Sequence, residues 1–447
     1  MYIYDAINDE KFKSRTIFHM PGHLGGRGFT GFDITPSMDV TELFETDDLH
    51  DPEGVIKESQ LMAAKAFGAQ HAYYMVNGST GGVISMVLGF LAPSEKVIAD
   101  RFCHKSFISA LALSGAEAVW VEPESIMGGT MWGGIAPGDI EKAIEENPDA
   151  KAVYITAPNY FGMMSDVKAI ARIAHEHNMY MLVDGAHGAH YGMSDKLPPN
   201  IISLGADAVC LSLHKTLPAL TQSAILLTNK RYDRIEAALK TMQSSSPSYL
   251  LISSCEYAAK FYKSAEAEPW DRLYDAVEKW FPEAMERIGE NVKYKDFSRI
   301  NARVSGDPFE AAEKLREKYN IAVECAYGGG VVAILNSFHK EEEIEKLYRA
   351  IEEIDPKKGD GISFLPLKAK KEASVREAFF APKRRVKLSE AAGKTAAREI
   401  MIYPPGICQI LPGEKIEKEH IEYFEDLLKR GAKIPGIEQS YCLIFDE

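Results

Sequence analysis

The segment Asp207-Ala-Val-Cys-Leu-Ser-Leu-His-Lys215 gives the strongest indication of how this chain folds, because an apolar run ends in a serine, a histidine and a lysine. The apolar residues predict a short buried strand. In α/β proteins, ligands bind beyond the carboxyl ends of the strands. A lone lysine after a strand is usually a solvated surface residue, but this context places Lys215 where its amine can form a Schiff base.

A second apolar strand, Met179-Tyr-Met-Leu-Val-Asp184, ends in a carboxylate and continues as Gly185-Ala-His-Gly-Ala-His190. The small residues let a flat group approach the backbone closely. A buried carboxylate raises the pKa of a pyridine nitrogen by its opposite charge, and burial lowers the pKa of a lysine amine. An acid, a lysine and a glycine-lined floor suit pyridoxal phosphate (PLP), with Asp184 at the ring nitrogen and Lys215 at the aldehyde.

The phosphate of such a cofactor needs backbone N–H groups and hydroxyls. Asn77-Gly-Ser-Thr-Gly-Gly82 lies between an apolar strand and a helix-like segment, and a helix N-terminus binds phosphate well, although this motif alone is more often a plain turn. We expect Ser79, Thr80 and Ser212 to share the phosphate. His104 follows another short strand and is a flat group that can stack on the ring.

These motifs together resemble the Orn/Lys/Arg decarboxylases in their short bacterial form, a group of fold-type-I PLP enzymes with the aspartate aminotransferase fold. The resemblance spans nearly the whole chain. The segments that carry it are Met20-Pro-Gly-His23, Asp47-Asp-Leu-His-Asp-Pro-Glu-Gly54, Asn77-Gly-Ser-Thr80, Asp100-Arg-Phe-Cys-His-Lys-Ser106, Asp184-Gly-Ala-His-Gly-Ala-His190, Ser212-Leu-His-Lys-Thr-Leu-Pro-Ala-Leu-Thr-Gln222, Ser246-Pro-Ser-Tyr249, Tyr403-Pro-Pro-Gly406 and Leu411-Pro-Gly-Glu414.

The resemblance implies roles for the matching residues. The lysine at Lys215 carries the cofactor, the histidine at His104 stacks on it, and the acid at Asp184 meets the ring nitrogen. His214 and Lys215 are the candidates for returning a proton to the substrate. The implied cofactor-binding set is Ser79, Thr80, His104, Asp184, His187, Ser212, His214, Lys215 and Ser246.

Three positions depart from the family pattern. Leu24 stands where the family usually has a lysine, Gly185 where a glutamate is frequent, and Gly82 where an asparagine is common. None of the three belongs to the expected cofactor set. Leu24 puts in doubt whatever substrate-side or subunit contact the lysine makes in relatives.

A metal site is the competing interpretation of Asp184, His187 and His190, because imidazole and carboxylate are common metal ligands. No third ligand at a fixed helical spacing accompanies them, so we expect no metal. His175 and His177 lie two apart on a predicted helix and do not share a face. We expect both to be solvated.

Composition places the chain among ordinary globular proteins. It has 447 residues, 46% of them hydrophobic and 26% charged, enough for about two or three domains. The sequence contains no apolar run long enough to span a membrane and no signal peptide, which predicts a cytoplasmic protein. Six distant cysteines without a Cys-x-x-Cys pair are expected to be reduced, and a net charge of −14 disfavours nucleic acid as a partner.

The order of elements predicts an α/β protein of the aspartate-aminotransferase-like PLP fold (type I), with a mostly parallel sheet and a smaller α+β C-terminal domain. The expected divisions are an N-terminal arm and loop (1–45), a PLP-binding major domain (46–285) and a C-terminal small region (286–447). Lys357 to Lys387 is the expected internal loop, and Tyr403-Pro-Pro-Gly406 a rigid turn. The predicted helices include 54–67, 139–146, 167–177, 308–318, 341–354 and 418–430.

Three functions compete. The first is PLP-dependent decarboxylation of a basic amino acid, arginine or lysine before ornithine, to the corresponding amine of polyamine biosynthesis. The second is another reaction on the same cofactor, such as transamination or β-elimination. An aminotransferase would be expected to hold the substrate carboxylate with a small-domain arginine, for which Arg384, Arg385 or Arg398 could be proposed, although no sequence feature assigns any of them that role. The third is a non-catalytic PLP-binding protein. The motif set favours the first.

The substrate's distal cation needs an acid, and a shared site needs a partner subunit. Asp47, Asp48, Glu324 and Glu414 are the candidate acids, although each also suits a capping or surface role. We expect a homodimer or higher even oligomer in which the stretch 244–249, with Ser246, reaches the partner's phosphate site. A helix N-cap and turn is the plainer interpretation of that stretch.

Overall fold

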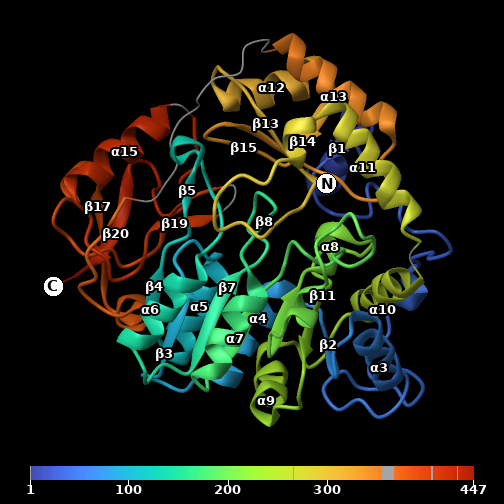
Figure 1. Ribbon diagram of the computed structural model, residues 1–447, viewed down its shortest axis with the longest axis horizontal. Coiled ribbons are helices and arrows are strands. Elements are labelled where there is room, and N and C mark those ends of the chain that lie inside the picture. Colours follow the sequence, from blue (N-terminus) through green and yellow to red (C-terminus); the bar gives the residue numbers. More distant parts are fainter. Residues whose placement is uncertain (1, 265, 355–366, 404–405, 430, 447) are drawn as a thin grey trace.

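The computed structural model describes residues 2–264, 266–354, 367–403, 406–429 and 431–446. Its largest element is a seven-stranded sheet with the strand order β2-β11-β10-β9-β7-β3-β4 (Figure 1). β11 runs antiparallel to both of its neighbours, whereas the other adjacent pairs are parallel. The strands are β2 (His71–Met75), β3 (Lys96–Asp100), β4 (Glu117–Val121), β7 (Ala152–Thr156), β9 (Tyr180–Asp184), β10 (Ala208–Leu211) and β11 (Ala224–Thr228).

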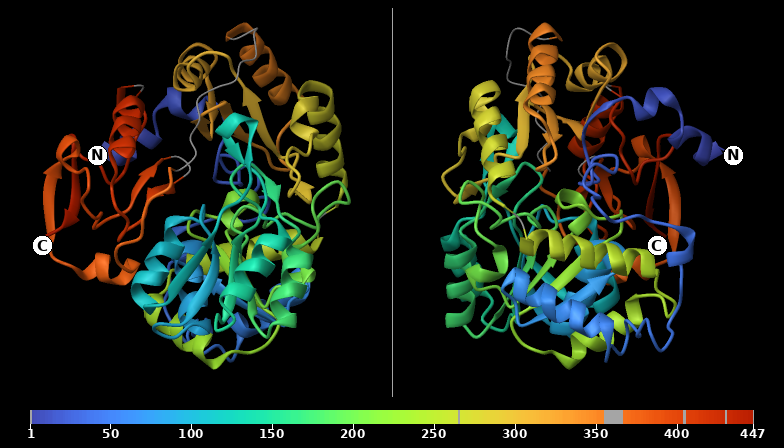
Figure 2. Two further views of the ribbon diagram at one scale, coloured as in Figure 1. Left: turned by 60° about the vertical axis from the view of Figure 1, so that its left-hand side comes forward. Right: turned by 90° about the vertical axis from the view of Figure 1, so that its right-hand side faces the viewer.

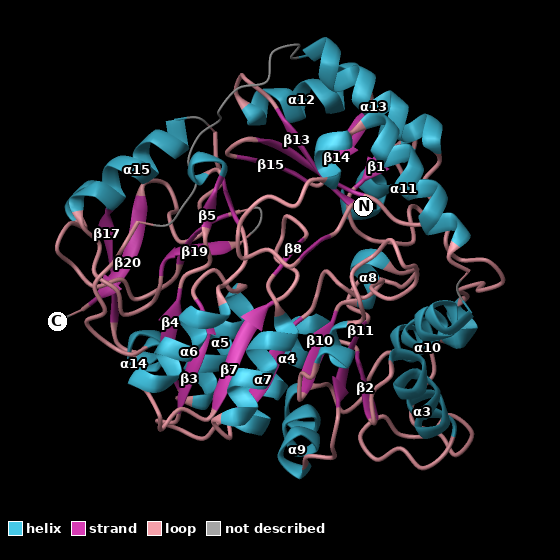
Figure 3. Cartoon of the chain, in the orientation of Figure 1, coloured by secondary structure: helices cyan, strands magenta, loops and turns pink. Residues whose placement is uncertain are grey.

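Helices cover both faces of this sheet, so the central strands are apolar on both sides (Figure 3). In β10, Val209 and Leu211 join the core on one face, and Ala208 and Cys210 join the core on the other. α4 (Gly78–Phe90), α5 (Lys105–Ser114) and α9 (Asp233–Met242) cover one face. α3 (Val55–Phe67), α6 (Pro137–Glu146), α7 (Val167–Glu176) and α10 (Tyr249–Ser264) cover the other.

The second part of the chain is an α+β layer. Its antiparallel sheet has the order β13 (Arg299–Arg303), β16 (Gly330–Ile334), β15 (Cys325–Tyr327), and α11 (Glu268–Trp280), α12 (Pro308–Lys318) and α13 (Glu341–Ile354) pack around it. β1 (Thr16–Phe18) pairs in parallel with β14 (Ile321–Val323). The N-terminal arm is therefore tied to this layer, as the blue segment in Figure 2 shows.

A third part follows, with a hydrophobic core of its own. It comprises α14 (Val375–Phe380), α15 (Lys418–Lys429), the pair β17 (Lys383–Lys387) and β20 (Tyr441–Phe445), and the pair β18 (Ile400–Ile402) and β19 (Ile407–Ile410).

The expected loop over 357–387 is wrong for its second half, because α14 and β17 occupy it; β17 is stabilised by pairing with β20, which local composition does not reveal. Residues 355–366 and the two prolines of the expected turn at 403–406 lie outside the described residues.

The remaining elements are short and lie mostly in connections. They are α1 (Tyr2–Ile7), α2 (Glu10–Lys13), α8 (Leu213–Thr216), β5 (Ser125–Ile126), β6 (Met131–Trp132), β8 (Met163–Met164) and β12 (Tyr294–Lys295), with five single turns of 3-10 helix at 36–38, 127–129, 201–204, 282–285 and 388–390. Among the described residues, no helix combines the length and the apolar character needed to cross a membrane.

A buried ion pair joins the third part to the main sheet. Arg101 follows β3, and its Nη2 lies 3.1 Å from Glu414 Oε2, with both side chains 8% exposed. Arg101 also donates to the carbonyl oxygen of Cys408 at 2.9 Å, and Glu414 accepts from the N–H of Leu411 at 2.7 Å. Each charge therefore has a partner within the interface.

Removing one partner of this pair is expected to destabilise the protein strongly. Arg101→Met leaves the Glu414 carboxylate buried without compensation, so the free energy of unfolding should fall by about 3–5 kcal/mol in urea titrations. Arg172→Met, at the exposed pair with Glu176, is the control and should change it by less than about 1 kcal/mol. Equal effects of the two substitutions would show that the buried pair contributes no more to the free energy of unfolding than the exposed pair.

Candidate active site

Lys215 lies at the carboxyl end of β10, in the one-turn helix α8. Its Nζ lies 2.9 Å from Nε2 of His187. Burial lowers the pKa of Lys215, whereas the nearby carboxylate of Asp184 raises it. In Figure 1, α8 lies between the main sheet and the yellow and orange second part. The half-buried lysine is therefore held near other ionisable groups.

Asp184 ends β9, the strand next to β10, where it stands opposite Cys210 in the register. Its side chain is buried, accepting a hydrogen bond from the N–H of Ala186 at 3.1 Å and a long one from the hydroxyl of Tyr154 at 3.5 Å. Burial raises the pKa of Asp184, and Lys215 lowers it. A carboxylate with few protein partners thus faces the region of the lysine.

Two hydroxyls from distant segments meet beside this region. Ser212 precedes α8, and its Oγ lies 2.8 Å from Oγ of Ser79, in the first turn of the long helix α4. Gly78, which begins that helix, has φ +76°, a conformation that favours glycine. Thr80 is exposed in the same turn. The two serines and the N-terminus of α4 form a cluster of hydrogen-bond donors.

Two neutral histidines lie at this region, His104 from another element and His214 next to Lys215 in α8. His104 precedes α5, and burial followed by the charge of Lys215 lowers its pKa to about 3. Burial lowers the pKa of His214 to about 4, although its hydrogen bond to the carbonyl of Ser223 raises it. The N–H of Gly22 donates to the carbonyl oxygen of His214 at 2.7 Å, so the N-terminal turn that contains Gly22 packs directly on α8.

The structure separates other predicted residues from this cluster. Ser246 is exposed, and its backbone bonds to Ser244. His190 turns toward Asp296, with 3.2 Å between Nε2 and Oδ2, whereas His187 turns toward Lys215. The described residues contain no group of three or more potential ligands placed to hold a metal.

His175 and His177 are both exposed, although the prediction that His175 is only solvated is incomplete. Its Nε2 lies 2.9 Å from Oδ2 of Asp207, at the opposite end of β10 from Lys215. Asp207 lies 32 residues after His175 in the sequence, so the spacing of the two histidines could not predict this contact.

The four candidate acids have different surroundings. Asp47 accepts backbone N–H groups that include those of Gly54 and Ile56 and thereby caps α3, and Glu414 is paired with Arg101. Asp48 accepts from the N–H of His50. Glu324 accepts from the hydroxyl of Tyr160 at 2.8 Å and from the N–H of Met20 at 3.1 Å, and its charge acts on Lys215. Among the four, Glu324 is the acid whose charge acts on Lys215.

The arginines considered for a carboxylate site lie in the third part of the chain. Arg384 pairs with Asp446, Arg385 donates to the carbonyl of Glu438, and Arg398 approaches Glu399. None of these contacts involves the lysine cluster. The arginine that does reach it is Arg299, at the start of β13, which sequence reasoning missed because no local motif marks it.

The departures from the family pattern at Gly82 and Gly185 have a steric explanation. A Cβ at Gly82 would lie 2.5 Å from Sγ of Cys210, and one at Gly185 would lie 2.8 Å from side-chain atoms of Ile201 and Leu211. In this chain the side chains of Cys210, Ile201 and Leu211 occupy the space that a larger residue at Gly82 or Gly185 would need. Leu24 is buried with φ +50° in the N-terminal turn.

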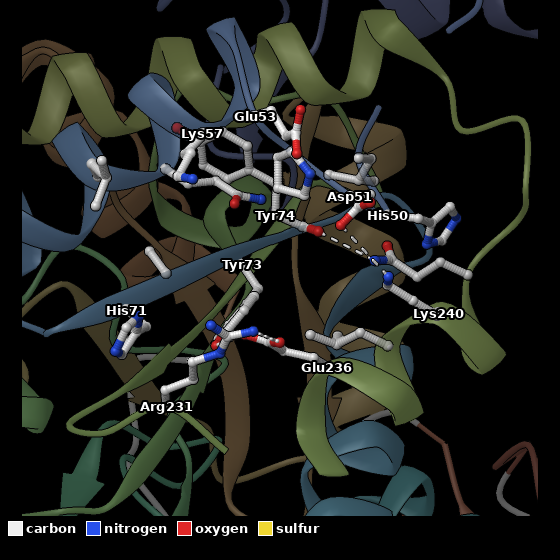
Figure 4. Close-up of a pocket in the computed structure, with 17 residues that line it drawn as sticks. His50, Asp51, Glu53, Lys57, His71, Tyr73, Tyr74, Arg231, Glu236 and Lys240 are labelled. Carbon is white, nitrogen blue, oxygen red and sulfur yellow. Dashed lines mark hydrogen bonds and ion pairs between the residues drawn. The ribbon is translucent and has the colours of Figure 1, made fainter. Parts of the chain in front are cut away.

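A separate cavity of about 370 Å³ lies at the edge strand β2 (Figure 4). Four of its charged groups are already partnered, since Arg231 pairs with Glu236 at 2.9 Å and Lys240 lies 3.9 Å from Asp51. None of its lining residues belongs to the cluster around Lys215. The cavity therefore does not identify the site that the lysine and aspartate form.

Family models match both ends of the chain. The model described as "Orn/Lys/Arg decarboxylase, major domain" matches residues 3–295, and that of the C-terminal domain matches residues 364–441. The chain belongs to the Orn/Lys/Arg decarboxylase family. PLP is accordingly the cofactor of this family member.

Relatives of this family member support the same assignment. Arginine decarboxylase of Bacillus subtilis is 32% identical, with 98% of this chain and 96% of the relative covered. Arginine decarboxylase of Bacillus anthracis is 30% identical, with 98% and 94% covered. For the fold alone, lysine decarboxylase A of Pseudomonas aeruginosa is a similar solved structure, with a TM-score of 0.79 at 16% identity, covering 99% of this chain and 80% of that one.

The fold is that of the aspartate-aminotransferase-like PLP enzymes. The lysine decarboxylase of Francisella novicida has a TM-score of 0.76 at 18% identity, covering 95% of this chain and 78% of that chain. Ureidoglycine-glyoxylate aminotransferase of Bacillus subtilis has a TM-score of 0.55 at 16% identity, with 76% and 92% covered. Because one fold hosts several reactions, the choice among them rests on the family and the site.

Proposed function

We propose that this family member removes the α-carboxyl group of a basic amino acid with PLP as cofactor. The observation that carries this proposal is the position of Lys215 beside Asp184, at the carboxyl ends of adjacent parallel strands, in a chain with both domains of the family. When bound, PLP supplies an electron-withdrawing ring that stabilises negative charge at the substrate's α carbon after carbon dioxide leaves.

The described residues fit that cofactor. Asp184 is a buried carboxylate with few protein partners, which suits a protonated ring nitrogen. Ser79, Thr80 and Ser212 offer hydroxyls at the N-terminus of α4, which suits a phosphate. Lys215 is an amine whose pKa is lowered by burial, which suits attachment to an aldehyde.

The neighbouring histidines complete the proposed site. His104 is neutral and flat, so it can lie against the ring without adding charge. His187 presents Nε2 toward the lysine. Lys215 or His214 then holds the proton that returns to the substrate's α carbon. Nδ1 of His214 donates to the carbonyl oxygen of Ser223, so in the neutral ring Nε2 carries a lone pair, and His214 would first take up a proton there before returning it.

Glu324 is the proposed partner of the substrate's distal cation. The charge of its carboxylate acts on Lys215, and the carboxylate is held by the hydroxyl of Tyr160 and the N–H of Met20. Two carboxylate oxygens can accept a guanidinium in a bidentate manner. Together with the arginine decarboxylases among the relatives, this favours arginine as substrate, followed by lysine and then ornithine.

A direct product assay tests the function. Purified protein with PLP is incubated separately with arginine, lysine and ornithine, and the amine is identified by mass spectrometry. Agmatine, cadaverine or putrescine would each establish the substrate. Formation of a 2-oxo acid instead of an amine would establish the competing aminotransferase reaction, and no product from any of the three would contradict the proposal.

A homodimer with shared sites belongs to the same proposal. Ser246 is exposed in its own chain, and the loop that contains it is joined to the N-terminal segment by the bond between His50 and the carbonyl of Ser244. That segment carries exposed apolar side chains, with Phe44 fully exposed and Leu43 51% exposed. Such side chains favour burial against another subunit.

Mixing two inactive variants tests whether the sites are shared. Lys215→Ala removes the lysine, and Ser246→Asp adds a negative charge where the partner's phosphate is proposed to lie. In a randomly exchanged mixture, one site of each mixed dimer keeps both native residues, so up to about a quarter of the native activity should return. Demonstrated subunit exchange without any recovery would mean that each chain builds its site alone.

A further inference from the structure

Arg299 is the buried charge that the proposed chemistry leaves unexplained. Its side chain is fully buried, and no carboxylate of the described residues lies within ion-pair distance of it. Its Nε and Nη1 have no hydrogen-bond partner within the described structure, and its Nη2 donates to Nδ1 of His187 at 3.1 Å. Nη2 also lies 3.4 Å from the carbonyl oxygen of His187, and the charge of Arg299 acts on the buried carboxylate of Asp296. A buried guanidinium with so few direct partners is costly, and its side-chain hydrogen bonds in the described structure are both to His187.

The chemistry of the two groups determines where the proton of His187 lies. A guanidinium has only donors, so Nδ1 of His187 must accept. Burial is the largest influence on His187, and together with the charge of Arg299 it lowers the pKa of the ring well below its usual value, so the ring is neutral. A neutral imidazole carries one proton, and with Nδ1 accepting, that proton is on Nε2.

The proton on Nε2 of His187 determines the protonation state of Lys215. Nε2 of His187 lies 2.9 Å from Nζ of Lys215. Because Nε2 donates, Nζ has to accept through a lone pair. A free amine has such a lone pair and an ammonium does not.

We propose that Arg299 is a positioning residue that fixes the Nε2-protonated tautomer of His187 and thereby holds Lys215 as the free amine. The proposal deepens the proposed function, on which it rests, because it concerns the lysine assigned to the cofactor.

The other groups around Lys215 act in both directions. Burial is the largest influence and favours the amine, whereas Asp184 and Glu324 favour the ammonium. Without Arg299, His187 is free to place its proton on Nδ1 and to accept from an ammonium through Nε2. The titratable and charged groups that face Lys215 or His187 are Asp184, Glu324, Cys210, His104, His214 and Arg299.

The test follows the reactivity of Lys215 in cofactor-free protein. Trace acetic anhydride acylates only free amines, so the pH dependence of Lys215 labelling, measured by peptide mass spectrometry against an internal standard, reports its protonation. Arg299→Met should move the labelling curve to higher pH and slow labelling at neutral pH about tenfold, which corresponds to one pH unit.

A double-mutant comparison separates a relay through His187 from the charge of Arg299 alone. In a His187→Phe background, Arg299→Met should cause little further shift, because the relay is already broken. A shift of the same size in both backgrounds would show that the charge acts directly on Lys215, and no shift in the native background would also overturn the proposal.

Two measurements keep the proposal open to refutation if Arg299→Met does not fold. Arg299→Lys retains a charged group with donors only, so it should preserve the native labelling curve. ¹⁵N NMR of histidine-labelled native protein, with the His187 signal assigned by its loss in His187→Phe, should show the Nε2-protonated tautomer. An Nδ1-protonated ring would overturn the proposal. Neither measurement involves turnover, so their failure is distinct from failure of the proposed function.

Discussion

Lys215→Ala is expected to abolish decarboxylation, lowering kcat on the order of 10⁴-fold or more. The alanine has no amine to attach PLP or to hold a proton for the substrate. In the native protein, borohydride should fix the cofactor irreversibly to Lys215, which peptide mass spectrometry can locate. The variant should lose this attachment while retaining its circular dichroism spectrum, since the lysine contributes no backbone contact that alanine cannot make.

Lys105 provides a matched control for this experiment. It lies directly after His104 but is exposed, and its α-helical position tolerates alanine. Lys105→Ala should therefore retain both activity and borohydride fixation. Fixation of the cofactor to a lysine other than Lys215 in the native protein would end the assignment.

Asp184→Asn is expected to leave PLP bound but to lower kcat by roughly 10³-fold or more. The amide has almost the same shape as the carboxylate, so the buried position is preserved, whereas its neutral oxygen no longer holds a proton on the ring nitrogen. The remaining proposed contacts, from Ser79, Ser212 and Lys215, keep the cofactor in place. Bound PLP is measured by absorbance, and kcat by release of carbon dioxide.

Asp207→Asn is the matched control, because Asp207 lies at the opposite end of β10 and accepts from the N–H of Met181. Asp207→Asn should leave the kcat of the folded protein unchanged, and any loss of total activity should equal the loss of folded protein. Near-normal activity of Asp184→Asn would mean that Asp184 has a structural role only.

Local patterns were sufficient for many of the elements. The helices Pro308–Lys318 and Glu341–Ile354 have the predicted bounds, because their apolar residues recur with the helical period and Asp307 caps the first of them. The apolar segments before Asp184 and Lys215 form buried strands as predicted. In contrast, β17 reads Lys-Arg-Arg-Val-Lys, and only its pairing with β20, more than 50 residues later, makes it a strand.

The sequence by itself determined the fold class and the meeting of Ser79, Asp184 and Lys215, because residues that follow parallel strands of one sheet gather at the same edge. Only the tertiary structure decided which charged side chains remain available there. Glu414 is paired with Arg101, whereas Glu324 and Arg299 are contributed by the second part of the chain. The partner of a buried charge is set by packing between segments more than 100 residues apart, and no local period or spacing encodes it.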